Sequence, residues 1–301
     1  MTPNERGGMS DDAGAEVPGR SSEIFLSVIV PAYNEERRLG PSLDAICHYL
    51  ADLDQTWELI VVNDGSTDRT SDLTTAVAAT EPRVRLIESP SNRGKGHAVR
   101  LGVLASRGQQ VLICDADLAT PIEEVEPLAK ALVEGNLVAI GSRAGPTSKI
   151  EVSQGRLREL MGRLGNRLIQ VVAVPEIADT QCGFKLFEGD SARVVFAYAR
   201  LDGWGFDFEI LHLCGRLGWP IAEIPVRWAH QAESKVRPLD YLRVLKELLY
   251  VRVIHRKTPA LVESNRRRAG VRLITQRVGG SGDAYGESFG ERGRISAAAE
   301  E

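Results

Sequence analysis

The sequence lacks the features of a secreted or membrane-spanning protein. Four of its 301 residues are cysteine, and they lie far apart without a C-x-x-C pair, which argues against a zinc knuckle, a redox pair or a disulfide scaffold. No stretch approaches the ~18 consecutive apolar residues of a membrane-spanning helix. Residues 1–22 have neither the cationic start nor the apolar centre of a signal peptide. We therefore expect reduced thiols, a cytoplasmic location and a disordered leader over residues 1–22.

The net charge of −4 is unevenly distributed along the chain. Between Arg227 and Arg272, twelve Lys and Arg accompany four Asp and Glu, a net charge of +8, so the remainder of the chain carries −12. A basic stretch of this kind is typical of a surface that meets anionic lipid, phosphate or nucleic acid, although a solvated helix face with a basic tail has the same composition. The acidic remainder argues against nucleic acid, so no nucleic-acid partner is expected.

The apolar pattern predicts an α/β fold with a mostly parallel sheet. Short runs rich in β-branched residues alternate with amphipathic stretches of helix length, of which 39–53 is the first. The expected strands are 26–30, 58–62, 84–87, 111–114, 137–140, 183–188 and 221–226, and the later expected helices are 156–172, 191–199, 206–217 and 238–256. Repeated βαβ units require a parallel sheet with helices on both faces.

The C-terminal part predicts a helix suited to a membrane surface. Its apolar positions alternate with basic ones, namely Leu242, Leu245, Leu248, Leu249 and Val253 with Arg243, Lys246, Arg252 and Arg256. Such a basic amphipathic helix can lie in the interface of an anionic bilayer. We expect one domain over residues 23–235, this membrane-facing helix over 236–257 and a flexible tail over 258–301.

Two carboxylates directly follow the expected strand 111–114. Residues two apart in an extended segment point to the same side, so Asp115 and Asp117 can converge on a hard divalent cation and the phosphates of a ligand. A solvated turn at a strand end is the alternative, because a D-x-D pattern alone is common.

Two further polar segments follow strands. Asp64, in the segment 63–68, can accept hydrogen bonds from a nucleobase or ribose, whereas a helix-capping turn is the alternative. The segment 92–97 places Arg93 and Lys95 among two glycines before a helix, which suits the approach of a phosphate, with solvated cations as the alternative. It matches neither a P-loop nor a dinucleotide-binding fingerprint, which argues against those two classes.

In order along the chain, these segments closely resemble the inverting family 2 glycosyltransferases with the GT-A fold. The motifs that carry the resemblance are Val30–Glu36, Val62–Asp68, Asn92–Gly96 and Asp115–Asp117. The second half is similar to the dolichyl-phosphate β-glucosyltransferase branch and related polyprenyl-phosphate glycosyltransferases, through Gly141–Arg143, Asp179–Lys185, Gly205–Glu209, Val226–Trp228 and Ser234–Lys235. The resemblance covers residues 26–257 and implies a GT-A fold, with a mostly parallel central sheet flanked by helices.

The resemblance implies a hexosyltransferase that uses Mg²⁺ or Mn²⁺ and a nucleotide-sugar donor, with UDP-glucose favoured. It implies a dolichyl or polyprenyl phosphate acceptor and peripheral contact with the cytoplasmic face of the membrane. Eukaryotic members of the glucosyl branch carry an N-terminal membrane anchor, which is not expected here. GDP-mannose is the alternative donor, although mannosyl members commonly carry Gln where this chain has Ala119. A non-catalytic nucleotide-sugar or membrane-surface binding protein is a second alternative, which the retained Asp115 and Asp117 argue against.

The same resemblance implies roles for individual residues. The residues expected around the base and ribose are Pro31, Tyr33, Glu35 and Asp64. Asp117 is expected to ligate the metal directly, and Asp115 to face the ribose or the water shell of the metal. The residues expected to hold or orient the acceptor phosphate or the donor diphosphate are Arg143, Lys185, Lys235 and Gln181, together with Lys95. Asp117, Arg143 and Lys235 form the expected catalytic group.

The chemistry of the acceptor decides whether a general base is needed. A phosphate monoester is already an anion near neutral pH, so positioning and electrostatic stabilisation would carry the rate. A sugar hydroxyl would need Asp207 or Glu209 as a base, whereas carboxylates that only stabilise a helix start are the alternative. His230 is a weak candidate, and the residues interpreted as core or surface fillers are Trp228, His48, His97, His212 and His255.

Overall fold

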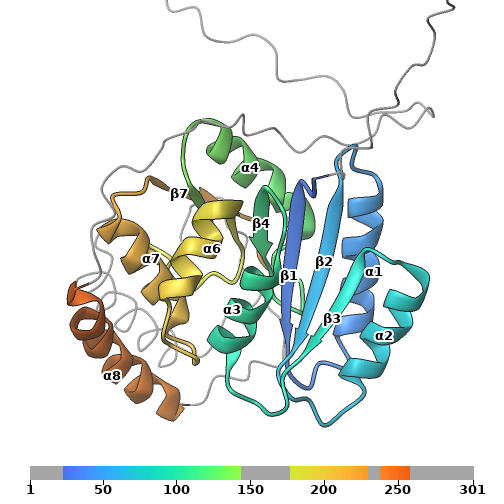
Figure 1. Cartoon of the computed structure of the whole chain (residues 1–301), viewed down its shortest axis with the longest axis horizontal. Coiled ribbons are helices and arrows are strands. Elements are labelled where there is room, and N and C mark those ends of the chain that lie inside the picture. Colours follow the sequence, from blue (N-terminus) through green and yellow to red (C-terminus); the bar gives the residue numbers. More distant parts are fainter. Residues whose placement is uncertain (1–22, 144–176, 230–237, 258–301) are drawn as a thin grey trace, which may run out of the picture.

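The structure is a computed structural model that describes residues 23–143, 177–229 and 238–257 (Figure 1). These residues form a central seven-stranded sheet in the order β3-β2-β1-β4-β6-β5-β7. The strands are β1 Leu26–Ala32, β2 Trp57–Asn63, β3 Val84–Glu88, β4 Gln110–Ile113, β5 Val138–Ser142, β6 Lys185–Glu188 and β7 Ile221–Pro225. Strand β6 runs antiparallel to β4 and β5, and the other neighbouring strands are parallel. The expected mostly parallel α/β sheet is confirmed.

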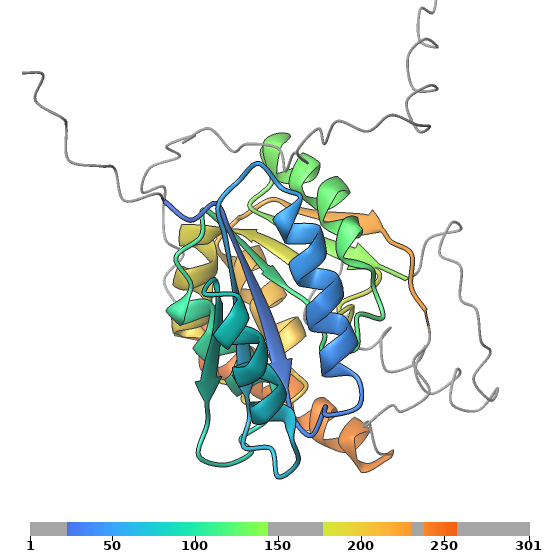
Figure 2. The ribbon, with the colours of Figure 1, turned by 90° about the vertical axis from the view of Figure 1, so that its right-hand side faces the viewer.

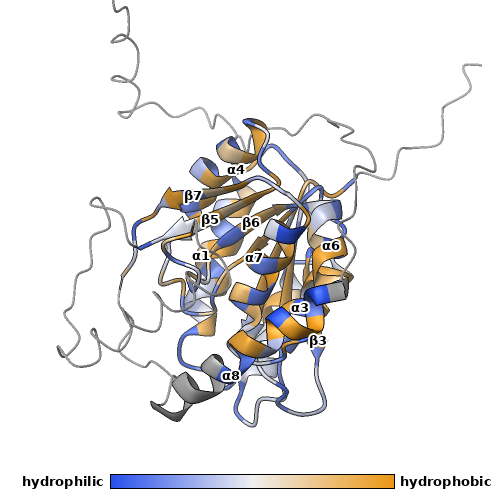
Figure 3. Cartoon of the chain, turned by 90° about the vertical axis from the view of Figure 1, so that its left-hand side faces the viewer, coloured by the Kyte–Doolittle hydropathy of each residue, from blue (hydrophilic) through white to orange (hydrophobic). Residues whose placement is uncertain are grey.

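Helices cover both faces of the sheet. They are α1 Leu39–Ala51, α2 Thr70–Thr80, α3 Lys95–Ala105, α4 Val125–Val133, α6 Gly189–Tyr198, α7 Phe206–Arg216 and α8 Pro238–Ile254, with the 3₁₀ turns η1 Ile122–Glu124 and η2 His255–Lys257. Helices α1 and α4 lie in front of the sheet in Figure 2, and α3, α6, α7 and α8 lie on the opposite side in Figure 3. The expected helix over 156–172, the leader and the tail fall outside the described residues.

Strand β1 shows why the apolar runs of the sequence are continuous. Val28 and Val30 belong to one hydrophobic core together with Leu43 of α1. Ile29 points the other way and belongs to a second core with Val99 of α3. A strand buried on both faces needs apolar side chains at every position rather than at alternate ones.

The antiparallel strand β6 brings its beginning to the functional edge of the sheet. Lys185, its first residue, pairs with Ile113 at the end of β4 and with Ile140 of β5. The segments that follow β1, β2, β4 and β5 and the segment that precedes β6 therefore meet at one edge, where open α/β sheets bind their ligands.

Candidate active site

Asp115 and Lys95 form the central ion pair of the site. Lys95 begins α3, and its Nζ lies 2.6 Å from Asp115 Oδ1. Burial opposes ionisation of Asp115, but the Lys95 ammonium outweighs it and holds the pKa of the carboxyl below its usual value. Burial likewise opposes the charge on Lys95, but Asp115 and Asp207 keep the pKa of its ammonium above the usual value. Both groups are therefore charged at neutral pH.

Gly183 makes room for the Asp115 carboxylate. A Cβ atom at position 183 would lie 2.1 Å from Asp115 Oδ2, far inside van der Waals contact. The backbone before β6 thus packs directly against the carboxylate, which only glycine permits.

Asp117 is held differently from Asp115. Burial and the neighbouring Asp115 charge raise the pKa of the Asp117 carboxyl. Arg38 Nη1 lies 3.3 Å from Asp117 Oδ2, and the same guanidinium donates two hydrogen bonds of 2.8 Å to Glu35. Arg38 therefore joins a residue after β1 to a residue after β4.

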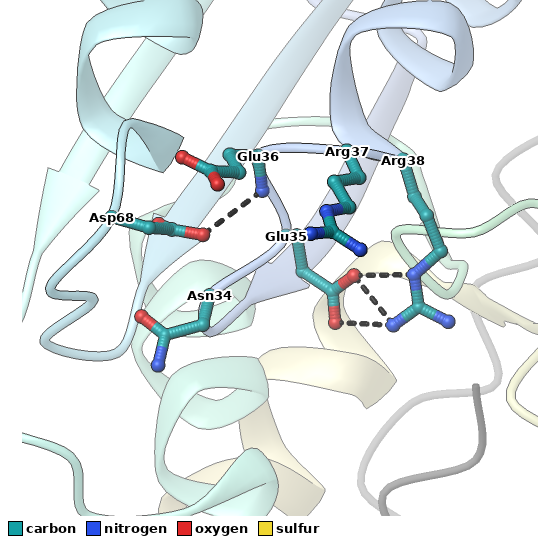
Figure 4. Close-up of a pocket in the computed structure, with 6 residues that line it drawn as sticks. All are labelled: Asn34, Glu35, Glu36, Arg37, Arg38 and Asp68. Carbon is teal, nitrogen blue, oxygen red and sulfur yellow. Dashed lines mark hydrogen bonds and ion pairs between the residues drawn. The ribbon is translucent and has the colours of Figure 1, made fainter.

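Arg38, which contacts Asp117, also lines a hollow of about 250 Å³ together with Glu35. Figure 4 shows the Arg38 guanidinium facing the Glu35 carboxylate, and Asp68 accepting a hydrogen bond from the Glu36 backbone NH at 3.1 Å. The hollow is polar on all sides, which suits a hydroxylated or charged ligand better than an apolar one.

The pair Asp115 and Asp117 fits a divalent cation that takes its other ligands from a substrate. Two mutually repelling carboxylates, one of which has a raised pKa, are the arrangement that a bound cation relieves. Within the described ranges, no group of three or more His, Cys, Asp and Glu residues is placed to hold a metal ion. Mg²⁺ commonly binds one or two carboxylates, waters and substrate phosphates, so a larger protein cage is not required.

Arg143 is fixed in place at the end of β5. Its Nε and Nη2 donate to the two oxygens of Asp179 at 2.8 Å each, and its backbone NH donates to the same carboxylate at 2.9 Å. Its guanidinium lies 5.7 Å from the centre of the Trp228 ring. Trp228 lines a small hollow of about 30 Å³ together with Asp115 and Arg143, and its interpretation as a filler stays a prediction.

Gln181, which contacts Asp179, carries an unsatisfied side-chain donor. Its backbone NH donates to Asp179 at 3.3 Å, and its buried side-chain Nε2 has no hydrogen-bond partner among the described residues. A buried donor without a partner costs free energy unless a ligand or water completes it. The expected substrate-orienting role of Gln181 stays a prediction.

Lys185, Asp207 and Glu209 are buried and make contacts within the protein. Lys185 Nζ lies 2.5 Å from Asp207 Oδ1, and the two side chains are 2% and 3% exposed. Glu209 is fully buried, and its two oxygens accept hydrogen bonds from the backbone NH groups of Arg200 and Leu201. His255 is buried, as expected of a core residue, and its Nε2 lies 2.7 Å from Glu209 Oε1. All three side chains are engaged in contacts within the protein, and their expected roles in substrate binding stay predictions.

The residues expected around the nucleotide are placed as follows. Pro31 is buried in β1, and Tyr33 is 37% exposed at the edge of the sheet. Asp64 is buried and accepts hydrogen bonds from the backbone NH groups of Arg93 and Gly94, so it holds the segment that carries Lys95. Lys235 and His230 lie outside the described residues.

A mostly parallel sheet of this order, with one antiparallel strand and an Asp-x-Asp pair at the carboxyl end of β4, has the GT-A fold. A sequence model described as glycosyl transferase family 2 matches residues 27–196. The chain belongs to this family and is an enzyme of the glycosyltransferase class.

Relatives with assigned names are similar over most of their length. The chain is 37% identical to the dolichyl-phosphate beta-glucosyltransferase ALG5C of Trichomonas vaginalis over 78% of this chain and 73% of that protein. It is 38% identical to the human dolichyl-phosphate beta-glucosyltransferase over 76% and 75%. The fold is similar to that of the glucosyl-3-phosphoglycerate synthase of Mycobacterium tuberculosis, crystallised with Mn²⁺, UDP-glucose and phosphoglyceric acid. The TM-score is 0.55, with 23% identity over 76% of this chain and 79% of that one.

Proposed function

We propose that this enzyme transfers glucose from UDP-glucose to a dolichyl or polyprenyl phosphate, with inversion at the anomeric carbon and with Mg²⁺ or Mn²⁺ as cofactor. The observation that carries the proposal is the similarity to dolichyl-phosphate beta-glucosyltransferases along about three quarters of both chains. The geometry of the site supports it, because Asp115 and Asp117 lie beside Lys95, Arg38 and the Asp179-bound Arg143.

In the proposed reaction, an oxygen of the acceptor phosphate attacks the anomeric carbon and forms the new C–O bond. The bond from that carbon to UDP breaks, and UDP leaves with the electron pair. Asp117 and Asp115 would hold the metal ion, which supplies positive charge against the diphosphate that develops as UDP leaves. Arg143 would orient one of the phosphate groups as a rigid cation, because Asp179 and Trp228 fix its guanidinium before substrate arrives.

The engagement of Asp207 and Glu209 supports a phosphate acceptor over a sugar hydroxyl. Both carboxylates are buried and bonded to protein groups, so neither is placed to accept a proton from a bound hydroxyl. A phosphate acceptor needs no such base, because its attacking oxygen is already largely deprotonated.

A transfer assay over a donor and acceptor panel tests the function. With Mg²⁺ and dolichyl phosphate, UDP-glucose is expected to yield a glucosylated lipid phosphate and free UDP, and a chelator is expected to stop the reaction. If only GDP-mannose supports transfer, the donor is GDP-mannose and not UDP-glucose. If UDP is released without lipid phosphate, the acceptor is a soluble hydroxyl rather than a lipid phosphate. If the protein binds the nucleotide without turnover, it is not the catalyst that we propose.

We also propose that α8 rests peripherally on the cytoplasmic face of an anionic membrane. Leu249, Tyr250 and Val253 are 61%, 52% and 70% exposed, and the exposed cations Lys246, Arg252 and Arg256 lie among them. Apolar side chains flanked by cations suit an anionic interface. Among the described residues, no helix has both the length and the apolar character to cross a bilayer. All four cysteines are free thiols, which fits the cytoplasmic side.

Vesicle binding tests this placement. The double variant Leu249→Glu/Val253→Glu is expected to bind phosphatidylserine-containing vesicles at least about tenfold more weakly in co-sedimentation, because each change removes buried apolar area and adds a repelled charge. Leu104→Glu is the matched control, since Leu104 is 46% exposed on α3. Equal binding by the double variant and the wild type would contradict the role of α8.

A further inference from the structure

Lys95 is seated against a segment that is distant in sequence, residues 200–206. A Cβ atom at Gly94 would lie 2.4 Å from the backbone oxygen of Asp202, and one at Gly96 would lie 2.5 Å from the backbone oxygen of Leu201. The backbone NH of His97 also donates to the Asp202 oxygen at 3.1 Å. The start of α3 therefore packs backbone to backbone against this segment, on both sides of Lys95.

The same segment supplies the aromatic surroundings of the Lys95 ammonium. Lys95 Nζ lies 5.6 Å from the centre of the Trp204 ring and 5.9 Å from that of Phe206. Cation–π contacts at these distances favour one position of the ammonium over others. A displacement of residues 200–206 would therefore move the cation that faces Asp115.

The segment is held on its other side by the C-terminal helix. Glu247 of α8 accepts a hydrogen bond from the backbone NH of Gly205 at 3.1 Å. A Cβ atom at Gly205 would lie 2.4 Å from the same carboxylate oxygen, and one at Gly203 would lie 3.0 Å from the other oxygen. The Glu247 carboxylate thus packs directly on the backbone at positions 203 and 205.

The 3₁₀ turn η2, which follows α8, is linked through Glu209 to the beginning of residues 200–206. His255 Nε2 lies 2.7 Å from Glu209 Oε1, and Glu209 accepts the backbone NH groups of Arg200 and Leu201 at 2.9 Å and 2.8 Å. Side chains of Leu248 and Val251, which are 1% and 0% exposed, supply the apolar seat of α8. These apolar side chains therefore anchor α8 to the protein. The polar contacts of Glu247 and His255 hold residues 200–206 instead, directly or through Glu209.

We propose that Glu247 and His255 are positioning residues for the nucleotide site: by clamping residues 200–206 they set the Lys95 ammonium against Asp115. The inference deepens the proposed function, since Lys95 is expected to contact the diphosphate of the donor. It also means that the helix assigned to the membrane surface is connected to the reacting centre through contacts between described residues.

A ligand-free measurement tests the clamp independently of any substrate. Amide hydrogen exchange by mass spectrometry is expected to rise at least about threefold in the peptide covering residues 94–98 in Glu247→Gln and His255→Gln, because the Asp202 contact with His97 loosens. Glu81→Gln is the control, since it breaks an exposed ion pair with Arg83 that lies outside this region. Unchanged exchange in both clamp variants would overturn the proposal whatever the donor is.

A double-mutant cycle then tests whether the effect acts through Lys95. Calorimetric binding of UDP with Mg²⁺ is expected to weaken about tenfold in Glu247→Gln, which corresponds to about 1.4 kcal/mol, and less than twofold further when Lys95→Met is already present. An equal loss in both backgrounds would overturn the relay through Lys95. If the wild type binds no UDP, the proposed donor fails, and the exchange experiment alone decides the clamp.

Discussion

Replacing Asp117 with asparagine is expected to lower the rate of glucosyl transfer at least about a thousandfold, a loss of about 4 kcal/mol of transition-state stabilisation. The change removes the carboxylate expected to hold the cation opposite the departing diphosphate. The measurement is formation of glucosylated lipid phosphate from UDP-glucose at saturating Mg²⁺. A variant that keeps more than a tenth of the wild-type rate would show that Asp117 is not the metal ligand.

The same variant is expected to fold as stably as the wild type. Burial and the Asp115 charge raise the pKa of Asp117, so its charged form is less favourable in the folded than in the unfolded chain. Asparagine removes that cost, and the ion pair that Asp117 makes with Arg38 at 3.3 Å is partly exposed, so the thermal midpoint should stay within a few degrees of the wild type. Asp72→Asn, on the exposed side of α2, is the matched control and should change neither quantity.

Replacing Lys185 with methionine is expected to destabilise the fold by about 3–5 kcal/mol, because it leaves Asp207 buried without its cation. The two side chains are 2% and 3% exposed, so water cannot take the place of the ammonium. The thermal midpoint should fall by roughly 10 °C for a chain of this size. Denaturant unfolding at pH 7 measures the free energy directly.

The double variant Lys185→Met/Asp207→Leu tests whether the lost stability comes from the unpaired charge of Asp207. Replacing both charges by apolar groups of similar volume is expected to recover most of the stability that the single variant loses, because no buried charge remains unpaired. A loss below about 1 kcal/mol in Lys185→Met, or no recovery in the double variant, would show that the pair is not what holds this region together.

Strand positions follow from the sequence, whereas the direction of β6 does not. The apolar runs predict each strand to within a few residues. The reason is clearest for β1, β2 and β4, because their burial on both faces favours continuous apolar side chains. The four residues of β6 are two apolar residues between Lys185 and Glu188, and this composition does not indicate the direction of the strand. Direction is set by pairing with β4 and β5, which are far away in sequence.

In the site, too, a local pattern can be recognised in the sequence, whereas a contact between distant residues cannot. Asp115 and Asp117 are recognisable in the sequence because two carboxylates directly after a buried strand are a local pattern. Arg38 is not, since its hydrogen bond to Asp117 joins residues 79 positions apart. Glu209 lies near the start of α7, and this position in the sequence does not reveal which way its side chain faces. Only the fold shows that Glu209 is fully buried.

The ion pair between Arg143 and Asp179 has a consequence for the chain between them. These residues lie 36 positions apart, one just after β5 and one shortly before β6, so the pair joins two segments of the chain at the same edge of the sheet. In the unfolded chain, the entropy cost of bringing two such residues together grows only with the logarithm of their separation, by about 0.6 kcal/mol for each doubling. A change in the number of residues between Arg143 and Asp179 should therefore have little effect on whether the pair forms, and it should leave the guanidinium of Arg143 beside Asp115.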